Sequence, residues 1–335
     1  MPTLPDTAAI PIARYRFTAR MGQSVHLPQY AGSLLRGQFG AALRKLACLT
    51  RQPTCTGCPL QASCAYTSIF EALPPTGHAL QAFSAIPNAY VVEPPPPVTE
   101  TPTTGSAHPA HYGAEQELVF HMVLAGAARD QLALIIDAWQ HALAGGLGKN
   151  RSQAQLQQVQ WIDGNGAAHA IWSIQDPHLV AHRACLEVPP APETGALHLH
   201  IHTPLRLQHQ GHPIKPEHLK ARTLIAGVAR RTALVLQFHA AQPQWGLQVP
   251  ATVALAEQLT DRRDLHWFDW VRYSSRQRQE MTLGGVLGSW TLHGPPQVLA
   301  DLWPWLWLGQ WLHVGKNASF GMGGYYLHAD PCLLG

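Results

Sequence analysis

The chain has 335 residues, of which 46% are hydrophobic and 13% are charged, so it holds enough apolar material for two packed domains and too little charge for a disordered chain. No run of about 18 apolar residues occurs, which excludes a membrane-spanning helix, and the first residues lack the basic flank and apolar stretch of a secretory signal. We therefore predict a cytoplasmic protein. The net charge is +3, and the chain contains 18 Arg but 5 Lys. This preference for arginine fits a phosphate-rich ligand and a GC-rich genome equally well.

The first part of the chain predicts a strand, a helix and a pair of strands. Residues Arg14 to Arg20 (RYRFTAR) alternate as a strand does. Residues Tyr30 to Leu46 carry apolar side chains at helical spacing, namely Leu34, Leu35, Phe39, Leu43 and Leu46. A proline-rich stretch that begins at Pro94 lies between two extended segments, Ala89–Val92 and Glu117–Leu124. We interpret this stretch as a long hairpin loop.

A helix, a glycine-rich turn and a strand follow one another in both halves of the chain. In the first half they are Ala128–Leu143, Gly145–Arg151 and Leu156–Ile162. In the second half they are Val298–His313, Gly315–Gly324 and Tyr325–His328. Both turns contain the tripeptide Gly-Lys-Asn, at residues 148–150 and 315–317. The identical setting of the two tripeptides indicates a duplicated domain.

The second half completes the same pattern with strand Leu197–Thr203, a helix over Glu217–His239, and strands Leu265–Tyr273 and Met281–Leu292. Strand-helix-strand, twice in each half, is the ferredoxin-like (RRM-like) arrangement. The sequence therefore predicts an α+β protein of tandem ferredoxin-like domains, with the helices on one face of each sheet. We expect the first domain at residues 1–165, with a cysteine-rich insertion (48–64) after its first helix and a proline-rich loop (94–112). We expect the second domain at residues 195–335, with a glycine-rich loop at 315–324.

Four of the six cysteines lie close together, at Cys48, Cys55, Cys58 and Cys64. The central CxxC pair is a common chelating unit, and four thiolates can close a tetrahedral Zn²⁺ site. An iron–sulfur cluster would also use four cysteines, and free buried thiols are the remaining alternative. A structural Zn²⁺ fits best, because the sequence shows neither an open coordination position nor a carboxylate near the cysteines, as a catalytic zinc site would need.

The two glycine-rich turns do not match a nucleotide-binding motif. Five residues rather than four separate Gly309 from Gly315, and Asn317 stands where a P-loop needs Ser or Thr. A glycine-rich turn with an embedded lysine still lets backbone N–H groups approach a phosphate. A plain helix-to-strand turn is the alternative. Two copies with lysine in both favour phosphate contact.

Two further patterns have a structural explanation that we favour. His198, His200 and His202 alternate, so on a strand they share one face. That face could bind a metal or RNA, but a solvated sheet face explains the pattern better. The tryptophans at helical spacing, Trp303, Trp307 and Trp311, could stack on bases but are more typical of a core.

Four segments resemble the CRISPR repeat-processing endoribonucleases of the RAMP superfamily. They are RGQFGAALRKL (Arg36–Leu46), CTGCPLQASCAYTSIFE (Cys55–Glu71), WVRYSSRQRQEMTLGGVLGSWTL (Trp270–Leu292) and LHVGKNASFGMGGYYL (Leu312–Leu327). The resemblance covers most of the chain. It implies one or two ferredoxin-like domains and cleavage of the repeat RNA in precursor transcripts, without a catalytic metal, to give guide RNAs that end in a 2′,3′-cyclic phosphate. The first glycine-rich turn departs from the family pattern, because Ser152-Gln153 stands where family members continue with glycine.

The resemblance also indicates where the site lies. The catalytic histidine of the family often sits at the first strand-to-helix connection, which here holds His26, with Tyr30 four residues later. RNA supplies its own nucleophile, so the enzyme needs a base, an acid and cations. We predict His26 and Tyr30 as the catalytic residues. The predicted RNA-binding cations are Arg36, Arg44, Lys149, Arg151, Arg230, Arg231, Arg272, Arg276 and Lys316.

Two other functions stay open at this point. The chain could be a non-cleaving RNA-binding RAMP subunit of a CRISPR effector complex, with other subunits of that complex as partners. It could also be a general nucleic-acid-binding zinc protein. Cleavage of repeat RNA in EDTA separates the first function from these two.

Overall fold

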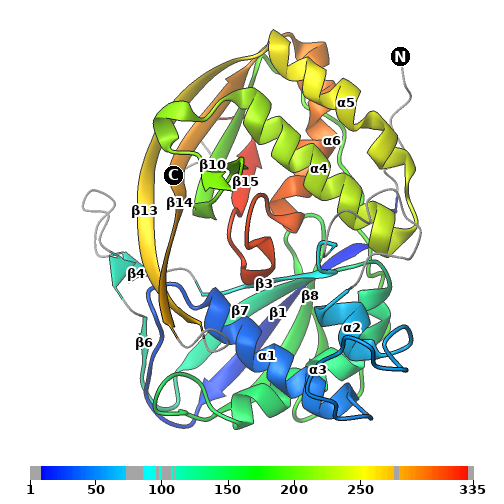
Figure 1. Cartoon of the computed structure of the whole chain (residues 1–335), viewed down its shortest axis with the longest axis vertical. Coiled ribbons are helices and arrows are strands. Elements are labelled where there is room, and N and C mark those ends of the chain that lie inside the picture. Colours follow the sequence, from blue (N-terminus) through cyan, green and yellow to red (C-terminus); the bar gives the residue numbers. More distant parts are fainter. Residues whose placement is uncertain are drawn as a thin grey trace. The chain divides into compact units, whose positions relative to one another are not determined.

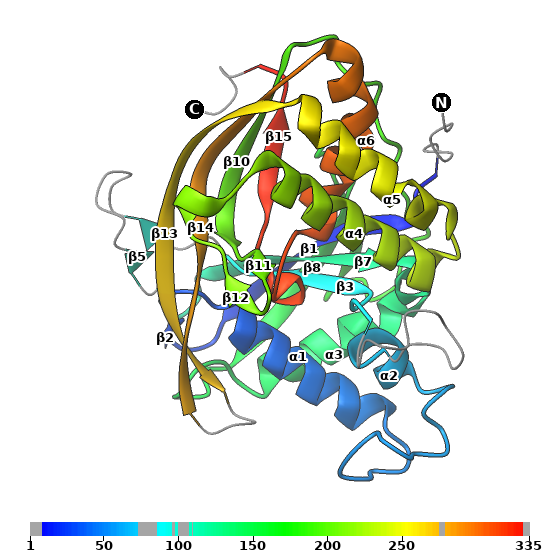
Figure 2. The same cartoon turned by 45° about the horizontal axis from the view of Figure 1, so that its top comes forward.

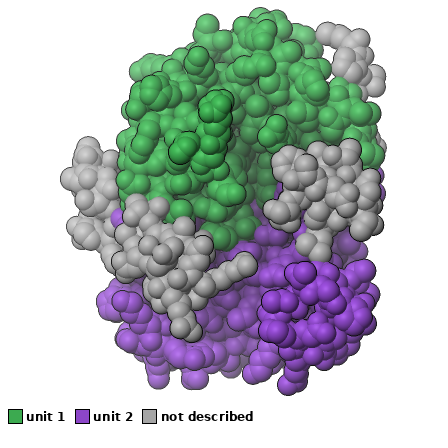
Figure 3. Space-filling view, in the orientation of Figure 1, with its two compact units in different colours: residues 1–10, 187–237, 242–335 green, residues 11–186, 238–241 purple. Residues whose placement is uncertain are grey.

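The computed structural model describes residues 9–72, 86–95, 98–99, 107–108, 110–274 and 279–330. These residues form two compact units, coloured in Figure 3. The N-terminal unit holds residues 11–186 and 238–241, and the C-terminal unit holds residues 1–10, 187–237 and 242–335. In the described part of the chain, no helix combines the length and the apolar character that a membrane crossing requires.

The N-terminal unit contains a five-stranded antiparallel sheet in the order β3-β7-β1-β8-β9. Its strands are β1 (Ile12–Met21), β3 (Tyr90–Glu93), β7 (Glu117–Ala125), β8 (Ala154–Ile162) and β9 (Ala168–Ser173). Helices α1 (Gly32–Ala47) and α3 (Leu132–Ala144) cover one face of this sheet, as Figures 1 and 2 show. Short helix α2 (Ala65–Phe70) follows the cysteines. Apart from α2 and the edge strand β9, this order is ferredoxin-like.

The C-terminal unit repeats the arrangement with a four-stranded sheet in the order β13-β14-β10-β15. The strands are β10 (Ala196–Leu205), β13 (Thr260–Ser274), β14 (Gln279–His293) and β15 (Tyr325–His328). Its helices are α4 (Ala221–Ala240), α5 (Gln244–Leu255) and α6 (Pro296–Leu312). Helix α4 runs from the first strand to the second and α6 from the third to the fourth, so the predicted tandem ferredoxin-like fold is confirmed.

Short elements complete the chain. The two-residue strands are β2 (Val25–His26), β4 (Val98–Thr99), β5 (Ala107–His108), β6 (His111–Tyr112), β11 (Gln208–His209) and β12 (His212–Pro213). The 3₁₀ turns are η1 (Gly126–Gln131), η2 (Pro216–His218), η3 (Ala256–Gln258) and η4 (Ala318–Phe320).

The predicted long elements are present with their ends shifted by a few residues, but α2, β9 and α5 were not predicted. Helix α5 has Pro250 in its interior, which normally argues against a helix. Helix α2 is only six residues long. The first three residues of β9 are exposed, so this edge strand lacks the alternation that marks a half-buried strand. The tryptophans Trp303, Trp307 and Trp311 of α6 are buried, which confirms the prediction that they belong to a core.

The core of the N-terminal unit is built around Trp139 of α3, which is fully buried. Its ring centroid lies 4.5 Å from that of Phe120 and 5.0 Å from that of Phe39. Its indole N–H points to the sulfur of Met122 at 3.4 Å. One side chain therefore joins both helices to the sheet.

Replacing this side chain tests the core. We expect Trp139→Ala to lower the free energy of unfolding of the N-terminal unit by roughly 3–5 kcal/mol, because it removes a buried aromatic and leaves a cavity. The measurement is chemical denaturation followed by circular dichroism. Leu49→Ala is the control, since Leu49 is 81% exposed and its loss should change stability by less than about 0.5 kcal/mol. Equal stability of the two variants would contradict this description of the core.

Candidate active site

His26 lies opposite a second histidine that the sequence did not single out. The two-residue strands β2 and β6 pair antiparallel, with Val25 opposite Tyr112 and His26 opposite His111. Directly opposed residues of an antiparallel pair share a face. The two imidazole centroids are 4.5 Å apart, with the ring planes at 41° to each other, and both side chains are exposed. The structure thus places His26 in a short strand instead of the predicted loop.

Buried neighbours hold the pair in place. Val25 and Leu27, on either side of His26, are 3% and 1% exposed, so alternation turns the imidazole outward. The backbone N–H of Leu27 donates to the carbonyl of Ala110 at 2.9 Å, which joins the two segments beyond the histidines. The backbone that carries the histidine pair is therefore anchored by buried residues and by a hydrogen bond between the two segments.

The first glycine-rich turn lies against the strand that carries His26. The Ser152 hydroxyl donates to the carbonyl of Ser24 at 2.7 Å. A Cβ placed on Gly148 would lie 3.6 Å from the carbonyl oxygen of His26. Lys149 and Arg151 of the same turn are exposed, and the Arg151 guanidinium donates to the carbonyl of Gly145 at 3.3 Å. The turn therefore adds two cations to the region of the histidine pair.

Tyr30, the other predicted catalytic residue, is only 2% exposed. A buried hydroxyl is poorly placed to meet the 2′-OH of an RNA. The exposed partner of His26 in this structure is His111. Nothing in the sequence pattern marks His111, because its pairing with β2 joins segments that are far apart in the chain.

Besides the exposed Arg151, three of the predicted RNA-binding arginines donate hydrogen bonds to protein groups. Arg36 donates to the Tyr90 hydroxyl at 2.9 Å and lies over the Phe70 ring. Arg44 donates to the carbonyl of Gln52. Arg231 donates to the carbonyl of Leu312 at 3.2 Å, and burial lowers its pKa to about 10, which leaves it protonated at neutral pH. These contacts connect elements of the fold.

The remaining predicted cations are exposed or lie outside the described residues. Lys149, Arg151, Arg230 and Lys316 are exposed and can meet a phosphate. Arg272 belongs to β13, but its side chain is not described, and Arg276 lies wholly outside the described residues.

The second glycine-rich turn is packed more tightly than the first. Gly315, Asn317, Gly321 and Gly323 all have positive φ, between 64° and 87°, which glycine adopts without strain. The N–H of Lys316 donates to the carbonyl of Arg206 at 2.8 Å, which leaves the lysine side chain exposed. This turn is a helix-to-strand connection that presents one cation.

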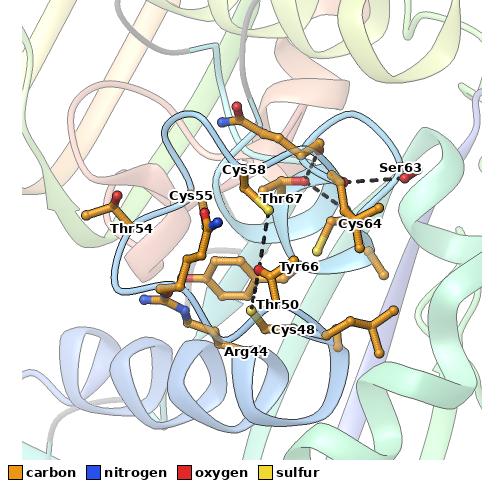
Figure 4. Close-up of a pocket in the computed structure, with 16 residues that line it drawn as sticks. Arg44, Cys48, Thr50, Thr54, Cys55, Cys58, Ser63, Cys64, Tyr66 and Thr67 are labelled. Atoms are coloured by element: carbon orange, nitrogen blue, oxygen red, sulfur yellow. Dashed lines mark hydrogen bonds between the residues drawn. The ribbon is translucent and has the colours of Figure 1, made fainter.

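The four predicted metal-binding cysteines line one pocket of about 190 Å³, shown in Figure 4. The Thr50 hydroxyl lies 3.4 Å from the Cys58 sulfur and 3.9 Å from the Cys48 sulfur. The backbone N–H of Cys58 donates to the carbonyl of Cys55, which closes the CxxC turn. Among the described residues, however, no three metal-binding side chains lie close enough to hold an ion as the chain stands. The donor chemistry suits Zn²⁺, but the thiols would have to draw together to bind it.

Both ferredoxin-like units have a glycine-rich turn that joins a helix to the strand after it, from α3 to β8 and from α6 to β15. Two family models match this chain. The N-terminal domain model AF_1859_N matches residues 10–184, which is more than half of the chain, and the model for the CRISPR-associated endoribonuclease Cas6 matches residues 199–325. The chain therefore belongs to the CRISPR-associated proteins of the RAMP type.

Solved structures share the fold at low sequence identity. The Cas6 (TTHB231) product complex is 17% identical with a TM-score of 0.56, over 96% of this chain and 100% of that chain. Thermus thermophilus Cas6 (TTHB231) is 16% identical with a TM-score of 0.52, over 96% of this chain and 99% of that chain. A chain of the partial Cas6-RT-Cas1–Cas2 complex is 12% identical with a TM-score of 0.54, over 98% of this chain but 47% of that chain, so the present chain spans about half of its length. Comparison with curated protein sequences gives no match.

Metal content tests the cysteine prediction. We expect the purified protein to hold one Zn²⁺ per chain and Cys55→Ser and Cys58→Ser to lose it, because the CxxC thiolates would supply half of the ligands. Elemental analysis is the measurement. Cys185→Ser is the control, since Cys185 does not line the pocket. Iron with visible absorbance would indicate a cluster instead, and a chain free of metal would contradict both.

Proposed function

We propose that this protein is an endoribonuclease that binds CRISPR repeat RNA and cuts it in precursor transcripts to release mature guide RNAs. The observation that carries the proposal is the exposed His26–His111 pair beside the first glycine-rich turn. The family to which the chain belongs supports the choice of RNA, and the paired imidazoles support cleavage rather than binding alone.

The reaction that this geometry supports is attack of the RNA 2′-OH on the adjacent phosphorus. One imidazole, neutral at the start, takes the proton from the 2′-OH as the bond from O2′ to phosphorus forms. The other, protonated at the start, gives its proton to the 5′-oxygen as the bond from phosphorus to that oxygen breaks. The products are a 2′,3′-cyclic phosphate and a 5′-hydroxyl, and the two histidines have exchanged protonation states.

Histidine suits both roles because its charge changes near neutral pH. Imidazoles with centroids 4.5 Å apart can both reach one phosphodiester lying over them. The exposed Lys149 and Arg151 would stabilise the negative charge that grows on the phosphorane. No step in this scheme uses a metal ion, so we propose that cleavage proceeds in EDTA.

We also propose CRISPR protein partners for the chain, because one structure of the same fold belongs to a Cas6-RT-Cas1–Cas2 complex. A non-cleaving role in an effector complex is the alternative to nuclease activity. That role predicts binding of repeat RNA without cleavage.

Substitution of the histidines tests the mechanism. We expect His26→Ala and His111→Ala each to slow cleavage of repeat RNA by about 10²–10⁴-fold, because each removes one positioned proton-transfer group. Binding should be nearly unchanged, since the cations dominate affinity. The measurement is single-turnover cleavage in EDTA with binding recorded in parallel.

His141→Ala is the control, because His141 is a surface histidine on α3 of the same unit. Normal cleavage by His26→Ala would place the catalytic group elsewhere. Cleavage that requires a divalent metal would contradict the metal-free scheme. Binding without cleavage by the wild-type protein would favour the effector-subunit role.

The lysines of the two glycine-rich turns test the phosphate contacts. We expect Lys149→Ala and Lys316→Ala each to weaken binding of repeat RNA. Each should also reduce the slope of log K against log salt by the amount that corresponds to about one phosphate contact. Fluorescence anisotropy over a salt series is the measurement. Lys220→Ala changes an exposed lysine just before α4 and should keep the wild-type slope. An unchanged slope in both turn variants would show that the turns do not contact phosphates.

A further inference from the structure

The central strand of the N-terminal sheet carries a row of arginines on the face opposite the helices. Tyr15, Phe17 and Ala19 of β1 are fully buried, and the residues between them turn to the other face. These alternate residues are Arg14, Arg16, Thr18 and Arg20. We call them the β1 arginine row.

Two arginines of the row are neutralised by carboxylates. Arg14 forms an ion pair with Glu93 of β3 at 2.7 Å. Arg20 forms an ion pair with Glu115. Their charges are therefore compensated within the protein.

Arg16 differs from both, because its partner carries no negative charge. Its Nε donates to His121 Nε2, on β7, at 3.3 Å, and the two residues are opposite each other in the register. Burial, reinforced by the charge of Arg14, lowers the pKa of His121 to about 4, so the ring is neutral near pH 7 and accepts this hydrogen bond. Among the described residues, Arg16 has no carboxylate partner.

The surroundings of Arg16 suit an anion of the RNA type. Gln160 of β8 lies opposite it on the other side, and Thr18 follows on the same face. Both are half-buried and neutral, so they can donate hydrogen bonds without competing for the charge. The guanidinium is held by His121 through one nitrogen, and its two terminal nitrogens can meet two oxygens of a phosphate.

The course of β1 connects this position with the histidine pair. Met21 ends the strand five residues after Arg16, at about 3.3 Å per residue, and Val25–His26 follows after a short turn. An RNA strand that lies along β1 would therefore pass from Arg16 towards His26.

We propose that Arg16, held by His121, binds a backbone phosphate of the repeat RNA on the face of the N-terminal sheet opposite α1 and α3, away from the scissile phosphate. The occupant follows from charge. Glu93, opposite His121 in the register, is already paired with Arg14, so the positive charge of Arg16 is available to a phosphodiester strand that runs towards the histidine pair. The choice of RNA as the occupant rests on the proposed function. His121 acts as a positioning residue.

Binding measured in a non-cleaving background tests the site. In the His26→Ala chain, we expect an added Arg16→Ala to weaken binding of repeat RNA about tenfold and to lower the salt slope by about 0.7 for a single strand. Arg16→Lys should keep the salt slope, because it keeps the charge. Arg222→Ala, which removes an exposed arginine paired with Glu257, is the control and should change neither quantity.

A chemical probe locates the contact. In a series of repeat RNAs, each with one phosphate replaced by a neutral methylphosphonate, one substitution outside the cleavage site should weaken binding to the Arg16 chain. The same substitution should have no further effect on the Arg16→Ala chain, because the pair is already broken. Thermal unfolding of both chains separates a lost contact from a disturbed sheet.

The outcomes separate this proposal from the proposed function. If the wild-type chain binds and cleaves repeat RNA while Arg16→Ala keeps the wild-type affinity and salt slope, the Arg16 site is wrong and the nuclease stands. If every methylphosphonate has equal effects on both chains, Arg16 does not hold a phosphate. If the wild-type chain does not bind repeat RNA, the proposed function fails and the Arg16 site fails with it.

Discussion

Strand β1 is hydrogen-bonded along both edges, to β7 on one side and to β8 on the other, and this double pairing decides where each of its side chains points. The aromatic residues Tyr15 and Phe17 enter the core, so Arg14 and Arg16 must face away from it. A register slip of one residue would bury the guanidinium groups and expose the rings, which is far too costly to occur. The alternation of side chains along β1 therefore determines both the packing of the core on one face and the positive charge on the other.

The periodic parts of the molecule could be predicted from the sequence, because they depend on neighbours along the chain. Leu35, Phe39 and Leu43 repeat at helical spacing and are buried in α1. The site depends on long-range pairing, which leaves no local trace. His111 follows a proline-rich stretch and gains its importance only through the pairing of β6 with β2. For Tyr30 the sequence was misleading in another way: it lies close to His26 along the chain, but the sequence does not reveal that its side chain is buried.

The two Gly-Lys-Asn tripeptides show how one short sequence can serve two surroundings. In the first turn, Leu147 and Ser152 close a small bridge and the residues between them are largely exposed. In the second turn, the buried His313 hydrogen-bonds the carbonyl of Gly321 at 2.8 Å, which ties the turn to the end of α6. The lysine is exposed in both cases, while the backbone is held by different means. The two turns therefore share an exposed lysine but differ in the contacts that hold their backbone.

The pairing of β2 with β6 has a consequence for variation in chain length. Strand β3 ends at Glu93 and pairs with β7, while His111 is held by β2. The described strands between them, β4 and β5, pair with each other. A change in the length of β4 or β5 would leave the register of the five-stranded sheet and the His26–His111 pairing unchanged, because neither strand takes part in them. These two strands can therefore change in length and composition through evolution without disturbing the histidine pair.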